Sequence, residues 1–153
     1  MKKKGLLIVL LFMFIGIGSL FAQSSGFIKP TFSFGLASAR YSGWGSDSGI
    51  VGSFDLDFVN SMGLTIGVQA WTYDGDIDFS GTAGGVGYTY DGGSWCIGAK
   101  LMYGAIMDVV YFGSNVNGTY WLYENIGISG LIDLNFPKDM TIIAVRVGVS
   151  MKF

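Results

Sequence analysis

The clearest pattern in the chain is an alternation of apolar and polar residues at its carboxyl-terminal end, from Thr141 to Phe153. Every second residue from Ile143 onward is apolar, and Ala, Arg, Gly, Ser and Lys occupy the positions between. A period of two is typical of a strand with one apolar and one polar face. The pattern predicts a strand that ends at an aromatic residue.

The same alternation recurs along the chain between short polar, glycine-rich segments. It is most regular where Phe54, Leu56 and Phe58 alternate with Ser53, Asp55 and Asp57. Breaks in the alternation, rich in Gly, Asn, Asp and Ser, indicate turns. The predicted strands cover about residues 27–40, 50–59, 63–73, 79–91, 94–103, 109–123, 126–136 and 141–153.

Eight is an even number, so the chain ends on the side where it began, as bacterial single-chain barrels require. Closing the sheet removes the unpaired strand edges that hydrocarbon does not tolerate. The sequence thus predicts an all-β fold, an eight-stranded antiparallel up-and-down transmembrane β-barrel. Its periplasmic turns are expected at 60–62, 92–93 and 123–125, and its external loops at 41–49, 74–78, 104–108 and 137–140.

Composition supports a lipid-facing surface. Of the 153 residues, 50% are hydrophobic and only 13% are charged, whereas soluble domains carry about 25% charged residues. Beyond the amino terminus no apolar run approaches the ~20 residues of a transmembrane helix. The apolar residues are dispersed in alternation, as in strands that face lipid.

The amino terminus reads as a secretory signal peptide over residues 1–22, followed by the barrel over residues 23–153. Lys2, Lys3 and Lys4 precede a short apolar segment, and Ala22 offers a cleavage point before Gln23. An uncleaved anchor helix is the alternative, because Leu20 stands where a small residue is preferred. We expect export to the bacterial outer membrane.

The last strand resembles the terminal signal by which bacterial outer-membrane barrels are recognised for assembly. The residues that carry the resemblance are Arg146, Gly148, Met151 and Phe153. With the eight strands, the chain resembles small outer-membrane barrels of the OmpX, OmpA transmembrane-domain and opacity-protein kind. The resemblance implies three partners: outer-membrane lipids, lipopolysaccharide and the β-barrel assembly machinery. It also implies a monomer, and any surface ligand is unknown.

If the polar face lines the lumen, its charged residues must pair with one another. We expect a polar network there, with glycines making room for its longer side chains. A filled interior is favoured over a conducting path, because eight strands leave an interior that side chains fill. The expected members are Asp55, Asp57, Lys100, Asp133, Arg146 and Lys152.

Catalytic, metal-binding and nucleic-acid-binding roles find little support. The chain has no histidine, so a serine nucleophile would lack the usual base. Asp74, Asp76 and Asp78 begin like a calcium loop, but Phe79 and Gly85 break the motif. The segment after residue 22 carries six basic and eleven acidic residues, which disfavours nucleic acid. We expect no catalysis, no metal and no cofactor.

Three functions remain open. The first is a structural or surface-interaction role for an outer-membrane barrel, and the second is a small channel for ions or apolar solutes. The third is a soluble, secreted, lipocalin-like barrel with its apolar face turned inward. An external aromatic patch of Tyr41, Trp44, Trp71 and Tyr73 could bind a ligand, although an interfacial aromatic belt also explains these residues.

Overall fold

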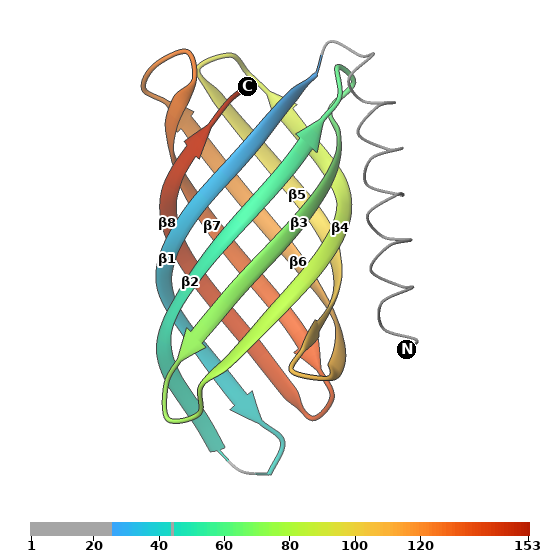
Figure 1. Ribbon diagram of the computed structural model, residues 1–153, viewed down its shortest axis with the longest axis vertical. Helices are drawn as coiled ribbons and strands as arrows, with labels where there is room; N and C mark the ends of the chain where they lie inside the picture. The colour runs from blue at the N-terminus through green and yellow to red at the C-terminus, as the bar shows by residue number, and fades with distance from the viewer. Residues whose placement is uncertain (1–25, 44) are drawn as a thin grey trace, which may run out of the picture.

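The protein is a closed barrel of eight antiparallel strands, each paired with its neighbours in chain order (Figure 1). This computed structural model describes residues 26–43 and 45–153, so the predicted signal peptide and Trp44 lie outside the described residues. The predicted all-β, up-and-down fold is confirmed. The strands are β1 (Phe27–Tyr41), β2 (Gly45–Val59), β3 (Leu64–Asp74), β4 (Phe79–Asp91), β5 (Trp95–Ile106), β6 (Val109–Trp121), β7 (Ile126–Pro137) and β8 (Met140–Met151).

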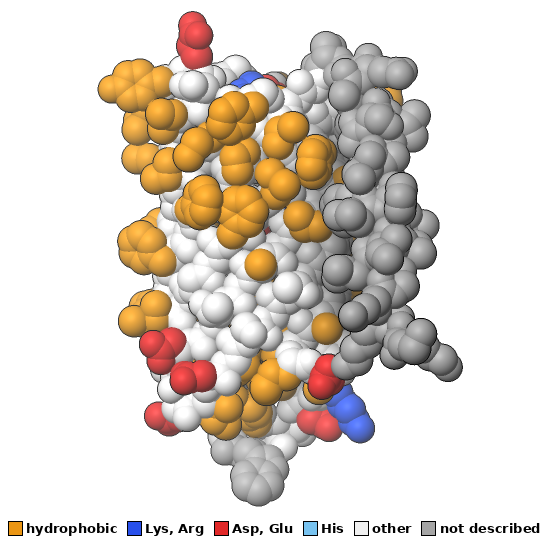
Figure 2. Space-filling view, in the orientation of Figure 1, with side chains coloured by type: hydrophobic (Ala, Val, Ile, Leu, Met, Phe, Trp, Pro, Cys, Tyr) orange, Lys and Arg blue, Asp and Glu red, His pale blue; other side chains and the backbone are white. Residues whose placement is uncertain are grey.

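The alternation in the sequence is an alternation between the outside and the inside of the barrel. Val145, Val147 and Val149 point outward and are about half exposed, while Asp55 and Arg146 point inward and are buried. The lipocalin-like alternative, with these apolar residues inside, is therefore wrong. Figure 2 shows many apolar side chains on the outer surface of the face in view, most of them in its upper half. Within the described residues, no helix is long and apolar enough to cross a membrane.

The two ends of the barrel differ in their connections. The termini end holds the start of β1, the end of the chain, and the connections 60–63, 92–94 and 122–125. The loop end holds the connections 42–44, 75–78, 107–108 and 138–139. At the termini end, the side chain of Asn60 accepts hydrogen bonds from the backbone nitrogens of Met62 and Leu64, at 3.0 and 2.9 Å. Gly63 takes a positive φ of 86°, which glycine adopts without strain.

The predicted loop 41–49 is wrong in extent. Gly45 to Gly49 belong to β2 and pair with Tyr41 to Ala37 of β1. The ladder continues because its backbone hydrogen bonds need no apolar side chains, so the polar sequence did not reveal the strand. β5 also extends to Ile106, which shortens the predicted 104–108 connection to two residues, and the 137–140 connection shrinks to 138–139.

The first and last strands close the barrel. β1 and β8 pair from Thr31 with Ser150 to Tyr41 with Met140. Beyond this ladder, Ile28 and Phe153 exchange two backbone hydrogen bonds of 2.9 and 3.0 Å. Figure 1 shows the end of the chain beside the start of β1. The chain therefore leaves no free strand edge in its described part.

Candidate functional site: a filled barrel interior

The interior of the barrel is divided into three layers along its axis. The middle layer contains buried charged and amide side chains, the termini end contains hydroxyl groups, and the loop end contains aromatic and aliphatic groups. The middle layer consists of Lys29, Asp55, Asp57, Gln69, Lys100, Asn115, Asn117, Asp133 and Arg146. It is the candidate site, because buried charges in a barrel decide whether the lumen conducts, binds or stays closed.

Arg146 of β8 is the centre of one half of the middle layer. Its guanidinium donates to Asp55 of β2 at 3.0 Å and to Asp133 of β7 at 2.7 Å, and its Nη2 forms a further ion pair with Asp133. It also donates to the Ser33 hydroxyl at 2.9 Å. Gln69 of β3 donates to both carboxylates. Arg146 thus joins β8 to side chains of three other strands, and Gln69 adds β3 through the two carboxylates.

Asp57 of β2 is the centre of the other half. It pairs with Lys100 of β5 and lies 3.8 Å from the ammonium group of Lys29 on β1. Lys29 also donates to the side-chain oxygen of Asn117 at 2.7 Å. Asn117 donates to Asn115, which in turn donates to Asp133. Hydrogen bonds and ion pairs therefore join the two halves into one continuous network.

The structure brings together five of the six residues predicted for this network. Asp55, Asp57, Lys100, Asp133 and Arg146 lie in the middle layer. Lys29, Gln69, Asn115 and Asn117 complete it, and the sequence analysis did not name them as members. Their parity places them inside, so the signal was present in the alternation.

Lys152, the sixth predicted residue, lies apart from the network. Its ammonium group pairs with Asp91 at 2.7 Å at the termini end, where both side chains are partly exposed. It also lies 4.4 Å from the centre of the Phe27 ring and 5.6 Å from that of Trp121. The pair joins β8 to β4, on the opposite side of the barrel mouth. Lys152 therefore helps to cover this mouth and does not fill the lumen.

The four residues of the predicted assembly signal have different surroundings. Arg146 is buried in the network, and Gly148 faces the β1 backbone at Phe32 and Ser33. Met151 is half-buried, whereas 70% of Phe153 is exposed. In the closed barrel only the last part of the predicted signal is accessible from outside.

Toward the termini end of the lumen, hydroxyl groups form a hydrogen-bonded layer beside the buried side chains of Val59, Cys96 and Trp121. Thr31 and Ser150 share a hydrogen bond of 2.6 Å, and Ser150 is bonded in turn to Ser129 at 2.5 Å. Thr65 donates to Thr89 across β3 and β4 at 2.8 Å. Short hydroxyl side chains satisfy one another here without any charge.

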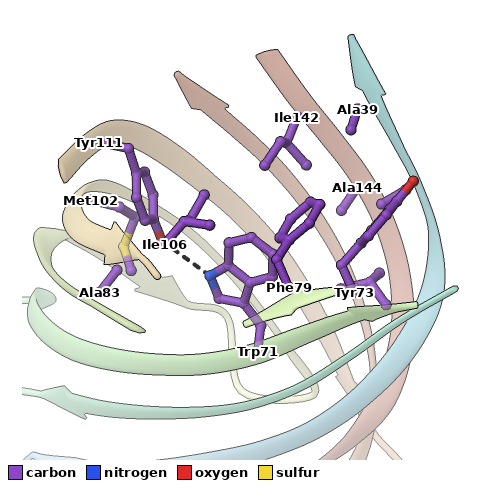
Figure 3. Packing of buried hydrophobic residues seen from close by; sticks show 12 residues of the cluster. Ala39, Trp71, Tyr73, Phe79, Ala83, Met102, Ile106, Tyr111, Ile142 and Ala144 are labelled. Atoms are coloured by element: carbon purple, nitrogen blue, oxygen red, sulfur yellow. Dashed lines mark hydrogen bonds between the residues drawn. The ribbon is translucent and has the colours of Figure 1, made fainter. Parts of the chain in front are cut away.

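The loop end of the lumen is filled by an apolar cluster (Figure 3). Trp71 packs edge-on against Phe79, with ring centroids 5.7 Å apart, and its indole nitrogen donates to the Tyr111 hydroxyl at 3.1 Å. Tyr73 stacks on Phe79 at 4.4 Å. This cluster was not predicted, because an apolar residue on the inward parity looks like an exception in the sequence. The external aromatic patch is wrong for Trp71 and Tyr73, which are both buried inside.

Glycines on the inward face make room for the long side chains, as the sequence analysis proposed. A Cβ atom at Gly67 would meet a carboxylate oxygen of Asp57 and would lie 3.1 Å from the Lys100 ammonium nitrogen. A Cβ atom at Gly113 would meet the Asn135 side chain. The interior has no spare volume at these positions.

The charges of the middle layer balance. Lys29, Lys100 and Arg146 face Asp55, Asp57 and Asp133, so the layer is neutral with all six groups ionised. A cavity where the middle layer meets the apolar cluster holds about 10 Å³, which is no more than one water molecule requires. The described residues contain no group of three or more His, Cys, Asp or Glu that could hold a metal ion. Such a layer can lock strands together, and it offers no vacant site for a substrate.

Comparison with solved structures shows which known folds this barrel resembles. Neisserial surface protein A aligns with a TM-score of 0.63 and 18% identity, over 83% of this chain and 97% of that one. The attachment invasion locus protein Ail of Yersinia pestis aligns with a TM-score of 0.63 and 10% identity, over 84% of this chain and 99% of that one. The amino-terminal β-barrel domain of Pseudomonas aeruginosa OprF aligns with a TM-score of 0.59 and 10% identity, over 84% of this chain and 100% of that one.

This chain has the fold of the small eight-stranded outer-membrane barrels. The predicted resemblance to OmpX-like and OmpA-like barrels is confirmed at the level of fold. The sequence matches no protein-family model and no curated protein. At sequence identities of 10–18%, the structural similarity shows a shared fold and no more. The role of this barrel therefore has to be inferred from its own side chains.

Proposed function

We propose that the protein is an integral outer-membrane β-barrel with a structural or surface-interaction role, and that it neither catalyses a reaction nor conducts. One observation carries the proposal. Bulky apolar side chains cover the outside of a barrel whose inside is filled by a self-neutralised charge network. This is the inside-out arrangement that a bilayer requires.

The outer surface supports membrane insertion. Exposed large apolar side chains lie on every strand of the barrel, including Leu36, Leu101, Phe112 and Val145. Soluble monomers seldom expose contiguous apolar patches larger than a few hundred Å². Aromatic residues such as Tyr90 and Trp95 lie near the termini end, where an interfacial girdle is expected. A lipid environment accounts for this surface.

The interior argues against a channel. Two layers of different chemistry lie in series along the axis: the apolar cluster at the loop end and, next to it toward the termini end, the charged layer. An ion would have to leave its water at the first layer and disrupt paired charges at the second.

A catalytic role has no support in the described residues. The chain has no histidine, and the interior carboxylates and amines are already paired with one another. A paired, desolvated carboxylate without access for a substrate cannot serve as a general base.

Surface interactions of this barrel would differ from those of a relative in fold. Ail has been solved in complex with a heparin analogue, sucrose octasulfate. Here the connections at the loop end are two to four residues long, and they are rich in aspartate. An acidic rim repels sulfated glycans, so we do not extend that ligand to this protein.

We further propose that the β-barrel assembly machinery reads the segment from Arg146 to Phe153 before the barrel closes. Arg146 is buried in the network and β8 is paired along its length with β1 in the closed state. Only an open strand would present Arg146 and Gly148 together with Phe153.

Two measurements test the main proposal. The protein expressed in a Gram-negative host should stay in the membrane pellet after carbonate washing and dissolve in detergent. The purified barrel in a planar bilayer should show no sustained, discrete openings. Release by carbonate would contradict the membrane assignment, and reproducible openings would support the channel alternative.

A further inference from the structure

The outward face of the barrel is hollowed over β2 to β5, mostly at the loop ends of β3 to β5. A shallow groove of about 630 Å³ lies there, with Phe32, Phe54 and Met107 at its edges. Figure 2 shows this region as a pale surface with few apolar side chains, between the apolar band above it and the acidic groups below it. The outward side chains that form the groove are small: Gly52, Ala70, Thr72, Ser80, Thr82 and Ala105.

The opposite side of the barrel is bulky where this side is hollow. In a closed barrel of eight strands in chain order, β7 and β8 lie opposite β3 and β4. Leu36 of β1 pairs with Val145 of β8, and its side chain extends the bulky side. We call this surface the ridge, and its large outward side chains are Leu36, Leu134, Phe136, Ile143 and Val145.

The charges of the loop end are divided between the same two sides. Beyond the groove, Asp74 ends β3, and Asp76 and Asp78 follow in the connection to β4. Beyond the ridge lie Arg40 of β1 and Lys138, which follows β7 and has Asp139 beside it. All six side chains are exposed. The groove side is therefore net negative, and the ridge side is net positive.

The two sides also match in depth along the barrel axis. β1 and β3 both run toward the loop end, and each passes outward from an apolar residue through a hydroxyl to a charge. Barrels inserted in one membrane share one orientation, so the acidic rim of one copy lies at the depth of Arg40 in another. The successive outward residues are Leu36, Ser38 and Arg40 on β1, and Ala70, Thr72 and Asp74 on β3.

We propose that the groove of one barrel receives the ridge of a second copy, so that identical barrels associate side by side in the membrane. The two surfaces lie on opposite sides, so each copy can use both at once. Such a head-to-tail contact does not close on itself and extends into rows. The inference rests on the proposed membrane insertion, and it departs from the monomer that the resemblance implied.

Close packing and polar contacts would stabilise this association. Lipid tails are as apolar as the ridge, so contacts between membrane-spanning elements depend on packing and hydrogen bonds, and small residues allow close approach. The hydroxyl groups of Thr72 and Ser80 are exposed on the outward face, and acyl chains offer them no partner. The facing copy would offer the Ser38 hydroxyl and the Arg40 guanidinium.

Other occupants fit the groove less well. The loop end is external in the predicted layout, and the phosphates of a lipopolysaccharide there would face Asp74 and Asp78. Groove against groove would place two acidic rims together. Groove against ridge instead brings Arg40 to the acidic rim, so charge and shape favour the same contact.

Disulfide cross-linking of two differently tagged copies, in outer-membrane fractions of a Gram-negative host, tests the inference. One copy carries Thr72→Cys in the groove, and the other carries Ile143→Cys on the ridge. The native Cys96 is buried and should not react. We expect the mixed product to exceed each self-product about fivefold or more, whereas random pairing gives about twofold. Tyr103→Cys, outward on β5 between the two sides, replaces Ile143→Cys in the control and should give no such excess.

The charges of the two rims allow a second test. R40E on the ridge copy should lower the mixed product about twofold to fivefold, as an exposed ion pair implies. D74K combined with D78K on the groove copy should lower it similarly. Joining the two altered copies reverses both charges and should restore the product. Failure to restore it would overturn the proposed pairing of the rims.

Filling the groove tests its shape. Ala70→Phe on the groove copy should lower the mixed product, because the added ring occupies the hollow. The matched control is Ala99→Phe, which adds the same ring on the outward face of β5 nearer the termini end and should have no effect. An unchanged product with Ala70→Phe would overturn the proposal. Bound lipopolysaccharide that Ala70→Phe releases, without a mixed product, would assign the groove to lipid and overturn it too.

The same samples separate this inference from the proposed function. Folding is checked by the shift in gel migration on heating, and insertion by resistance to carbonate washing. A barrel that folds and inserts but gives no excess of mixed product overturns the side-by-side contact alone. A protein that fails to insert contradicts the membrane assignment and this inference with it. A dominant product between two Thr72→Cys copies would show a symmetric contact and would overturn the head-to-tail arrangement.

Discussion

The side chains inside the barrel have to fit its narrow interior as well as balance one another's charge. Long side chains such as Lys100 and Arg146 lie opposite or beside glycine, because an eight-stranded interior is narrow. Gly35 is the clearest case, since it pairs with Arg146 and a Cβ there would meet the β8 backbone. Adding or removing one group should therefore change stability according to what it touches.

Gly67→Ala should destabilise the barrel by about 1–3 kcal/mol, because the added methyl group meets Asp57 and comes close to Lys100. Gly130→Ala is the matched control, since nothing lies within 4 Å of a Cβ at that position on β7. It should be neutral or slightly stabilising. Urea unfolding in lipid vesicles measures both. Equal stabilities for the two variants would mean that the interior relaxes around Gly67.

Arg146→Met should cost about 3–5 kcal/mol, because it leaves the buried carboxylates of Asp55 and Asp133 without their cation. Lys152→Met removes an ion pair in which both partners are partly exposed, so it should cost only about 0.2–1 kcal/mol. Unfolding in the same vesicles compares them. Similar losses would show that Lys152 contributes to closure of the mouth more than its exposure suggests.

At the scale of the strands, alternation predicted their number, their order and which face of each is apolar. It succeeded because the outward parity is largely apolar in each strand, as from Ile143 to Val149. It failed where a paired strand segment is polar on both faces, as at Gly45 to Gly49. Backbone pairing continues there without apolar side chains to reveal it.

The contents of the lumen could be predicted only in part. Five of the six charged residues predicted to lie inside do so, but their pairing depends on register and on closure of the barrel. Asp55 and Arg146 are 91 residues apart and meet across β1. Aromatic residues are common in interfacial belts, which suggests an outward position for Trp71 and Tyr73. Both share the inward parity of Gln69, however, and the alternation is the stronger signal.

A single substitution can separate the pairing of the chain end with β1 from its proposed role as an assembly signal. The backbone of Phe153 pairs with Ile28, whereas its ring is largely exposed. Phe153→Ala keeps the pairing, so stability in vesicles should change by less than about 1 kcal/mol. The amount of barrel assembled in the outer membrane of a Gram-negative host should fall several-fold if the ring is part of the assembly signal.

Met62→Ala is the control for this prediction. Met62 is also an exposed apolar residue at the termini end, and its side chain lies in the connection between β2 and β3. Quantitative immunoblotting of outer-membrane fractions compares the two variants. Equal levels of both would contradict recognition of Phe153 by the assembly machinery.

At the scale of the whole molecule, the three layers of the interior act in series. Apolar side chains fill the loop end, the charged layer joins the strands, and hydroxyl groups are bonded to one another toward the termini end. Because a path through the lumen must cross all three, opening one layer should not open the barrel.

Removing aromatic rings from the apolar cluster at the loop end should destabilise the barrel without opening its lumen. Trp71→Ala combined with Tyr111→Ala removes the two inward rings joined by a hydrogen bond and leaves Arg146, Asp55 and Asp133 in place. The double variant should lose at least the ~3–5 kcal/mol typical of one buried Trp-to-Ala change. It should still show no sustained conductance in a planar bilayer, because the charged layer remains filled. Discrete openings in the double variant, absent from the unchanged barrel, would show instead that the aromatic cluster alone closes the lumen and that the ion pairs serve only to hold the strands together.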